Sequence, residues 1–200
     1  MSENENKLPE LVTMGHPRLA RPSEPVPQGE ITGEAFQERL RVLNACMVEY
    51  LGIGIAAPQI GWWERFFMLV VMADRGDGEM EPRVEVWINP EITHASQSHN
   101  WAWEGCLSVP GLRGWIRRPD AVSVRGLNQH GQEVSREFTG WEARVFQHEF
   151  DHLDGMLFPY RALDPRHIIT LEEMEHRDEW PSDWPAPGAR DTPLGRVVPE

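Results

Sequence analysis

Four runs in the middle of the chain constrain the fold most, because they are rich in Val, Ile and Phe and are regularly interrupted by turn residues. They cover residues 65–72, 83–90, 121–128 and 131–140, and a Gly- and Asp-containing loop is expected at 75–80. β-Branched and aromatic side chains suit the pleated surface of a sheet, and the turn residues between runs indicate reversals of the chain. The sequence therefore predicts a mixed or antiparallel sheet.

Two amphipathic segments flank these runs. Apolar residues recur at three- and four-residue steps in both, which is the spacing of one face of a helix. The first segment ends at Gly52 and the second at Gly155, both suitable stop signals. The fold class predicted is α+β, with mixed or antiparallel sheets around a central helix at 141–155. The apolar positions are Phe36, Leu40, Leu43, Met47 and Tyr50 in the first segment, and Ala143, Phe146, Phe150 and Leu153 in the second.

The domain organisation predicted is a single catalytic domain over residues 1–180. With 200 residues, 40% of them hydrophobic, the chain is long enough for one domain with a substantial core. Five prolines within residues 1–33 disfavour helix there, so this stretch is expected to be an extended arm lying over the domain. Residues 168–180 are expected to form a last helical turn or two. The Pro- and Trp-rich residues 181–200 are expected to be a loosely ordered tail.

Charge and hydropathy exclude several classes of protein. A net charge of −13 argues against binding to nucleic acid or anionic lipid, both of which attract basic surfaces. The longest apolar run, at 66–73, is far shorter than the roughly 20 residues of a membrane-spanning helix. The first ten residues are polar and acidic and do not resemble a secretion signal, so a cytoplasmic location is expected.

The two cysteines are better candidates for thiol chemistry than for a disulfide in a reducing compartment. Cys46 lies next to the apolar stripe of the first amphipathic segment, and is expected to be a buried structural thiol. Cys106 lies in a turn rich in Gly, Ser and Pro at 103–114, where a thiolate could bind a divalent ion.

The second amphipathic segment carries the pattern H-E-x-x-H. His148 and His152 are four residues apart and share one helix face, while Glu149 lies beside them, so the pattern predicts a metal site with a general base. The alternative is a helix with solvated acidic residues and partly buried histidines.

A catalytic ion usually has three protein ligands, so a third must come from elsewhere. A third histidine at position 158 would complete one known pattern, but that residue is Phe158. Glu172, in an acidic segment, and Cys106 both remain candidates from the residues alone.

Three motifs, taken together, resemble those of the bacterial and organellar peptide deformylases. They are GIGIAAPQIG at 52–61, EGCLSVP at 104–110 and QHEFDHLDG at 147–155, and the segment 11–26 is similar to the family's N-terminal arm. The resemblance covers roughly residues 8 to 165. It implies a mixed α+β domain that removes the N-formyl group from the initiator methionine of new polypeptides and releases formate.

The resemblance also implies roles for individual residues. Cys106, His148 and His152 would bind one divalent metal ion, typically Fe²⁺ in this family, with Zn²⁺, Ni²⁺ or Co²⁺ as replacements. Glu149 would move the proton, and the side chain of Gln59 and the backbone N–H of Leu107 would stabilise the oxyanion. The residues implied in peptide binding are Ile53, Gly54, Gly105 and Arg113, and Glu104 and Arg118 are expected to form an ion pair behind the cysteine.

The partners expected are N-formylmethionyl peptides and nascent chains, without direct binding to nucleic acid or membrane. The acidic segment LEEMEHRDEW at 171–180 makes docking on ribosomal RNA unfavourable. A monomer is the expected oligomeric state. Two alternatives remain open: a gluzincin-like peptidase that uses Glu172, and a catalytically silent relative that only binds N-terminal peptides.

Overall fold

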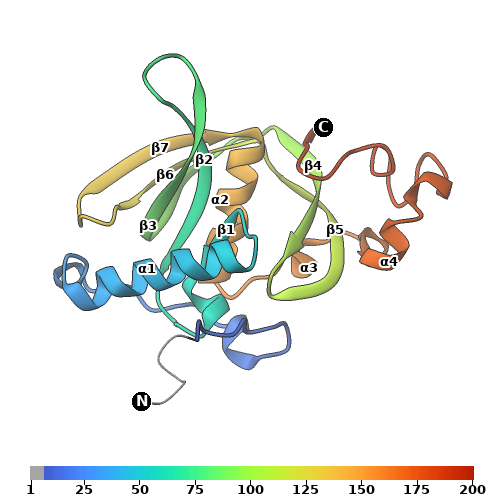
Figure 1. Cartoon of the computed structure of the whole chain (residues 1–200). Helices are drawn as coiled ribbons and strands as arrows, with labels where there is room; N and C mark the ends of the chain where they lie inside the picture. Colours follow the sequence, from blue (N-terminus) through green and yellow to red (C-terminus); the bar gives the residue numbers. More distant parts are fainter. Residues whose placement is uncertain (1–6) are drawn as a thin grey trace.

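The chain folds into two antiparallel sheets with a helix between them, as the computed structural model of residues 7–200 shows (Figure 1). The first sheet has the strand order β1-β2-β3-β6-β7, and the second has the order β8-β5-β4-β9. The first sheet comprises β1 (Gly54–Ala56), β2 (Phe66–Asp74), β3 (Met80–Ala95), β6 (Ala121–Leu127) and β7 (Glu133–Thr139), and the second comprises β4 (His99–Cys106), β5 (Val109–Pro119), β8 (Ile168–Thr170) and β9 (Val198–Pro199).

Two long helices accompany the sheets. Helix α1 (Glu34–Glu49) covers one face of the first sheet, and α2 (Gly140–Leu153) lies between the two sheets (Figure 1). The short helices are α3 (Phe158–Arg161) and α4 (Leu171–Met174), with 3₁₀ turns at Pro17–Ala20, Gln28–Glu30, Ala57–Ile60, Pro165–His167 and Arg177–Glu179. None of the described helices is long and apolar enough to cross a bilayer.

Strand β2 explains how the core is divided. Its successive side chains point to opposite faces of the sheet. Phe66 and Met68 pack in the cluster formed with α1, whereas Phe67 and Leu69 pack in the cluster formed with α2. Because both faces are covered, the strand is a continuous apolar run instead of an alternating one. Cys46 is fully buried in the α1 cluster, and this burial raises the pKa of its thiol.

The α+β prediction is confirmed, and the four predicted strands correspond to β2, β3, β6 and β7. The hairpin of β4 and β5 was not predicted, because residues 99–119 contain Gly105, Pro110, Gly111 and Gly114, which weaken strand propensity. Its tight turn at Leu107–Ser108 is what places the cysteine at the end of a strand.

The described part of the predicted arm, residues 7–33, fastens three distant segments to one another. The backbone N–H of Val12 donates to Gln59 O at 2.8 Å, that of Met14 to Ser108 O at 2.7 Å, and that of Ser23 to Leu153 O at 2.8 Å. The arm passes so close to Gly155 that a Cβ there would lie 2.5 Å from Arg21 N, and this residue also has a φ of +73°. Only glycine fits that position without strain.

Residues 181–200, predicted to be loosely ordered, contain little regular structure but make specific contacts with the second sheet. Trp103 Nε1 donates to Ala189 O at 2.8 Å, and Val198 of β9 pairs with Trp101 of β4. Ala189 is fully buried in a cluster with Trp103 and Trp180. The domain boundary at residue 180 stays a prediction, although these contacts cross it.

Candidate metal centre

Cys106, His148 and His152 come together in the structure. One potential ligand atom from each lies within 4.8 Å of the other two. The cysteine ends strand β4, and both histidines project from the same face of α2, with Cys106 Sγ 3.3 Å from His152 Nε2. Cys106 is therefore the third member of this group, while Glu172 is an exposed residue of the short helix α4 and does not belong to it.

The turn after β4 holds the cysteine sulfur by hydrogen bonds. The backbone N–H of Ser108 donates to Cys106 Sγ at 3.4 Å, and Gln59 Nε2 does so at 3.6 Å. Gln59 is buried in the 3₁₀ turn Ala57–Ile60, and its Oε1 accepts a bond from the Ala56 N–H at 2.8 Å. That bond orients the amide so that its NH₂ group faces the cysteine. Donors aimed at sulfur stabilise a thiolate, the form that binds metal ions.

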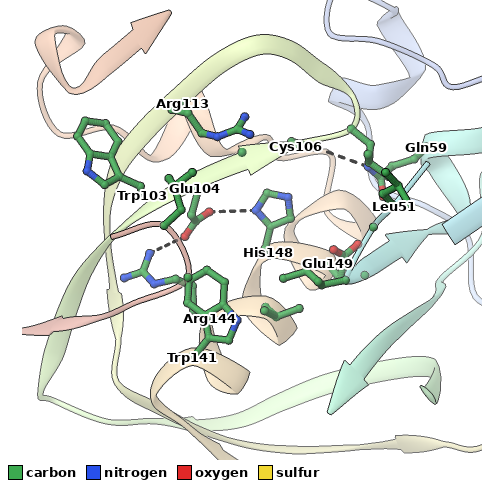
Figure 2. A pocket seen from close by; sticks show the side chains of 18 residues that line it. Leu51, Gln59, Trp103, Glu104, Cys106, Arg113, Trp141, Arg144, His148 and Glu149 are labelled. Carbon is green, nitrogen blue, oxygen red and sulfur yellow. Dashed lines mark hydrogen bonds and ion pairs between the residues drawn. The ribbon is translucent and has the colours of Figure 1, made fainter. Parts of the chain in front are cut away.

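Glu104 organises the charges behind the centre (Figure 2). It accepts bonds from Arg118 Nε at 2.6 Å and Nη2 at 2.9 Å, from Arg144 Nη1 at 2.5 Å, and it faces His148 Nδ1 at 3.0 Å. Burial by itself would raise the pKa of the Glu104 carboxyl, but the charge and hydrogen bonds of Arg118, with those of His148 and Arg144, hold it well below its usual range. The ionised carboxylate fixes the His148 ring with Nε2 toward the group of ligands.

Arg118 extends this network to Asp151 of α2. Its Nη1 donates to Asp151 Oδ2 at 2.8 Å, and Asp151 also accepts a bond from Arg161 Nε at 3.1 Å. The predicted ion pair between Glu104 and Arg118 is confirmed as part of this larger set, and both side chains are almost fully buried. The network joins β4, β5 and α2, and β4 and α2 carry the three candidate ligands.

Glu149 is a buried carboxyl beside the group of Cys106, His148 and His152. Its Oε2 has no hydrogen-bond partner among the described residues, and burial raises its pKa to about 7. Gly54 makes room for it, since a Cβ at that position would lie 2.8 Å from Glu149 Cδ. The glycine was predicted to allow a peptide to approach, and the structure gives it this second role.

A cleft of about 330 Å³ opens beside Cys106 and His148, and the residues that line it include all those predicted to bind the peptide. Ile53 and Gly54 line it at the start of β1, and Gly105, Leu107 and Arg113 line it from the β4–β5 hairpin. Arg113 lies over Gly105 so closely that a Cβ there would be 2.6 Å from Arg113 Cζ. Gly105 therefore accommodates this guanidinium group.

Sequence reasoning missed the far end of the cleft. That end is lined by Trp141, Arg144 and Val145 of α2, and by Leu194 and Gly195 of the C-terminal segment. The helical residues precede His148 by about one and two turns, so helical periodicity could have found them. The C-terminal pair carried no signal, because it reaches the cleft only through long-range packing.

The donor set fits a divalent transition-metal ion. A thiolate and two imidazoles suit zinc and iron, and three protein ligands leave a further coordination position free. Two other features agree with this fit: the carboxylate behind His148 and the unpartnered Glu149 Oε2 beside the ligands.

Comparison with known proteins gives a consistent result. A family model described as polypeptide deformylase matches residues 8–167. The peptide deformylase of Leptospira biflexa is 37% identical over 153 residues, covering 74% of this chain and 84% of its own length. Peptide deformylase 3 of Streptomyces avermitilis is 35% identical over 196 residues, covering 95% of this chain and 85% of its own. The crystal structure of the class I type b peptide deformylase of Acinetobacter baumannii bound to Met-Ala-Ser superposes with a TM-score of 0.71 and 32% identity, covering 78% of this chain and 98% of that one.

Proposed function

Because the chain belongs to the polypeptide deformylase family, we propose that it is a metal-dependent hydrolase that acts on newly made polypeptides. It removes the N-formyl group from their N-terminal formylmethionine and releases formate. The observation that carries the proposal is the convergence of Cys106, His148 and His152 next to the unpartnered carboxyl of Glu149.

Cys106, His148 and His152 would hold one divalent ion, with Fe²⁺ as the proposed physiological metal and Zn²⁺, Ni²⁺ or Co²⁺ as replacements. When bound, such an ion supplies Lewis acidity, which lowers the pKa of water and polarises a carbonyl oxygen. Sulfur and imidazole ligands accommodate each of these metals. Because Fe²⁺ beside a thiolate is sensitive to oxidation, the protein should be prepared without oxygen.

Glu149 serves twice in the proposed reaction. It takes a proton from the attacking water, and it then delivers a proton to the amine nitrogen as the bond between that nitrogen and the formyl carbon breaks. Its place beside the ligand group, in a pocket without competing hydrogen bonds, supports both steps. One water and one formamide are thereby converted into formate and a free amino terminus.

Gln59 and Leu107 would stabilise the negative charge that develops on the formyl oxygen. Gln59 Nε2 is turned toward the centre by the bond from Ala56 N–H, and the Leu107 backbone lies in the turn that follows the cysteine. Fixed donors of this kind typically account for about 10²–10³ in turnover.

Ile53, Gly54, Gly105 and Arg113 would hold the peptide along the cleft. Ile53 is 51% exposed at the cleft edge, which suits an apolar contact with the methionine side chain. The guanidinium of Arg113 donates a hydrogen bond to the neighbouring Leu112 O at 2.9 Å. Its other N–H groups would be available to carbonyl groups of the peptide that follow the methionine. The Acinetobacter enzyme bound to Met-Ala-Ser supports a peptide of this type as ligand.

The decisive experiment measures formate released from formyl-Met-Ala-Ser by anaerobically prepared, iron-loaded protein. The proposal expects turnover by the parent chain, and a loss of about 10²-fold or more in Glu149→Gln with the metal content unchanged. Metal binding and peptide binding without formate would identify a silent peptide-binding protein instead. Unchanged metal content in Cys106→Ser would contradict the proposed ligand set.

A further inference from the structure

The C-terminal segment contributes a wall to the cleft that faces the proposed substrate. Leu194 and Gly195 line the cleft together with Trp103, Trp141 and Arg144. The match to the family model ends at residue 167, so this wall comes from a part of the chain that the family model does not describe.

Both ends of the loop that carries this wall are fastened to the second sheet. On one side Ala189 is fully buried and its O accepts the bond from Trp103 Nε1, while Thr192 Oγ1 donates to Gly188 O at 2.6 Å. On the other side Val198 pairs with Trp101, and Glu200 N donates to His99 O at 3.0 Å. The intervening residues, which include Leu194 and Gly195 of the cleft lining, are therefore fixed at both ends.

Leu194 itself is held as an exposed apolar side chain. It is 52% exposed although it follows a run of anchored residues. Gly195 has a φ of +78°, and a Cβ built on it would be 4.0 Å from Trp141 Cζ2, so this turn lies against the tryptophan ring. An apolar side chain next to an aromatic wall suits contact with an apolar ligand group.

The positions of Trp141 and His148 on helix α2 indicate how far the wall lies from the candidate metal ligands. Trp141 precedes His148 by seven residues, which corresponds to about 10 Å along a helix axis. If the N-formyl group lies at the metal ligands, the space between it and the wall would thus be about long enough for the first residue of the peptide with an extended, unbranched side chain.

We propose that the Leu194–Gly195 turn is the end wall of the pocket for the first side chain of the peptide and limits the length of that side chain. This inference rests on the proposed function, because it assumes that the formyl group lies at the ligand group. Leu194 is then a specificity-determining residue supplied by the C-terminal segment.

The test compares kcat/KM for formyl-Met-Ala-Ser with that for an analogue whose first residue is 2-aminooctanoic acid, two atoms longer. Leu194→Ala should raise kcat/KM for the longer analogue relative to the methionine peptide by about tenfold, the effect of a methylene group or two in an apolar pocket. Leu194→Trp should lower this ratio and lower the value for the methionine peptide. Leu163→Ala, which removes a 69% exposed leucine outside the cleft, is the matched control and should leave both values unchanged.

Calorimetric binding of the unformylated products separates this inference from the proposed function. If the parent releases no formate, the proposed function fails, but the affinities of Met-Ala-Ser and its longer analogue still report the length limit. Ratios that stay within twofold of the parent in both Leu194→Ala and Leu194→Trp, in turnover or in binding, would overturn the inference.

Discussion

At the scale of single residues, the site depends on buried charges that are each matched by a neighbour. Glu104 faces three cationic or ring nitrogen partners, and Arg118 divides its donors between Glu104 and Asp151. In a buried network, removing one partner leaves another charge without compensation, which costs much more than the intact pair contributes.

Replacing Arg118 with Met should therefore disturb both stability and metal binding. We expect the free energy of unfolding to fall by about 3–5 kcal/mol, and metal affinity to fall about 10–100-fold because Glu104 would no longer be held against His148. Urea denaturation and competition with a metal indicator would measure the two effects. Arg125→Met, which breaks an exposed pair with Glu91, is the control and should change stability by less than about 1 kcal/mol. Equal effects of the two substitutions would show that burial of the network is irrelevant.

Gly54 offers a way to move Glu149 without removing it. A methyl group in Gly54→Ala would collide with the Glu149 carboxyl, so we expect turnover to fall about 10²-fold while the metal content stays at the parent level. Gly29→Ala is the matched control, because nothing lies within 4 Å of a Cβ there. Formate assays and metal analysis on both proteins would decide, and an active Gly54→Ala enzyme would mean that Glu149 is free to shift.

At the scale of elements, local patterns predicted α1, α2 and four of the strands, because each has an apolar spacing of its own. The pattern at 148–152 also predicted that two histidines share a helix face. From the residues alone, both Cys106 and Glu172 remained candidates for the third ligand. The β4–β5 hairpin has weak strand propensity, and only its packing against α2 brings the sulfur to the imidazoles. The resemblance to a family, not the spacing, favoured Cys106.

The N-terminal arm should influence the metal site through its backbone. Met14→Pro removes the N–H that donates to Ser108 O, and the loss of that bond should cost about 1–3 kcal/mol and loosen the turn after Cys106. Metal affinity should fall with stability. Met14→Ala keeps the N–H and alters only a 41% exposed side chain, so it should behave like the parent. Thermal unfolding with and without added metal would measure both effects. If Met14→Pro has the stability and metal affinity of the parent, the arm does not influence the site.

At the scale of the whole molecule, an ion held between β4 and α2 should couple the two sheets. Removing it with a chelator should lower the free energy of unfolding by an amount set by its concentration, about 2.7 kcal/mol when the free ion stands at 100 times its Kd. The melting temperature with and without chelator measures this, under reducing conditions. In Cys106→Ser the difference should largely vanish, and a chelator effect of the same size in that variant would place the ion elsewhere.

The whole-molecule features were the least predictable. The C-terminal segment was expected to be loosely ordered from its Pro-rich composition, but burial of Ala189 beneath Trp103 and pairing of β9 with β4 depend on surfaces that the rest of the chain must first create. The composition of a segment indicates whether that segment would be ordered in isolation, but it carries no information about a surface formed by the rest of the fold.

The pairings of the N-terminal arm have a consequence for biosynthesis. Val12, Met14 and Ser23 bond to partners at Gln59, Ser108 and Leu153, so the first part of the chain to be made finds its last partner only after α2 has been made. Closing such long loops is slow and gains little until the final contact forms. A ribosome must therefore have translated the chain through α2 before the arm can complete its pairings, so the proposed metal-binding group would form late in synthesis, once most of the protein has been made.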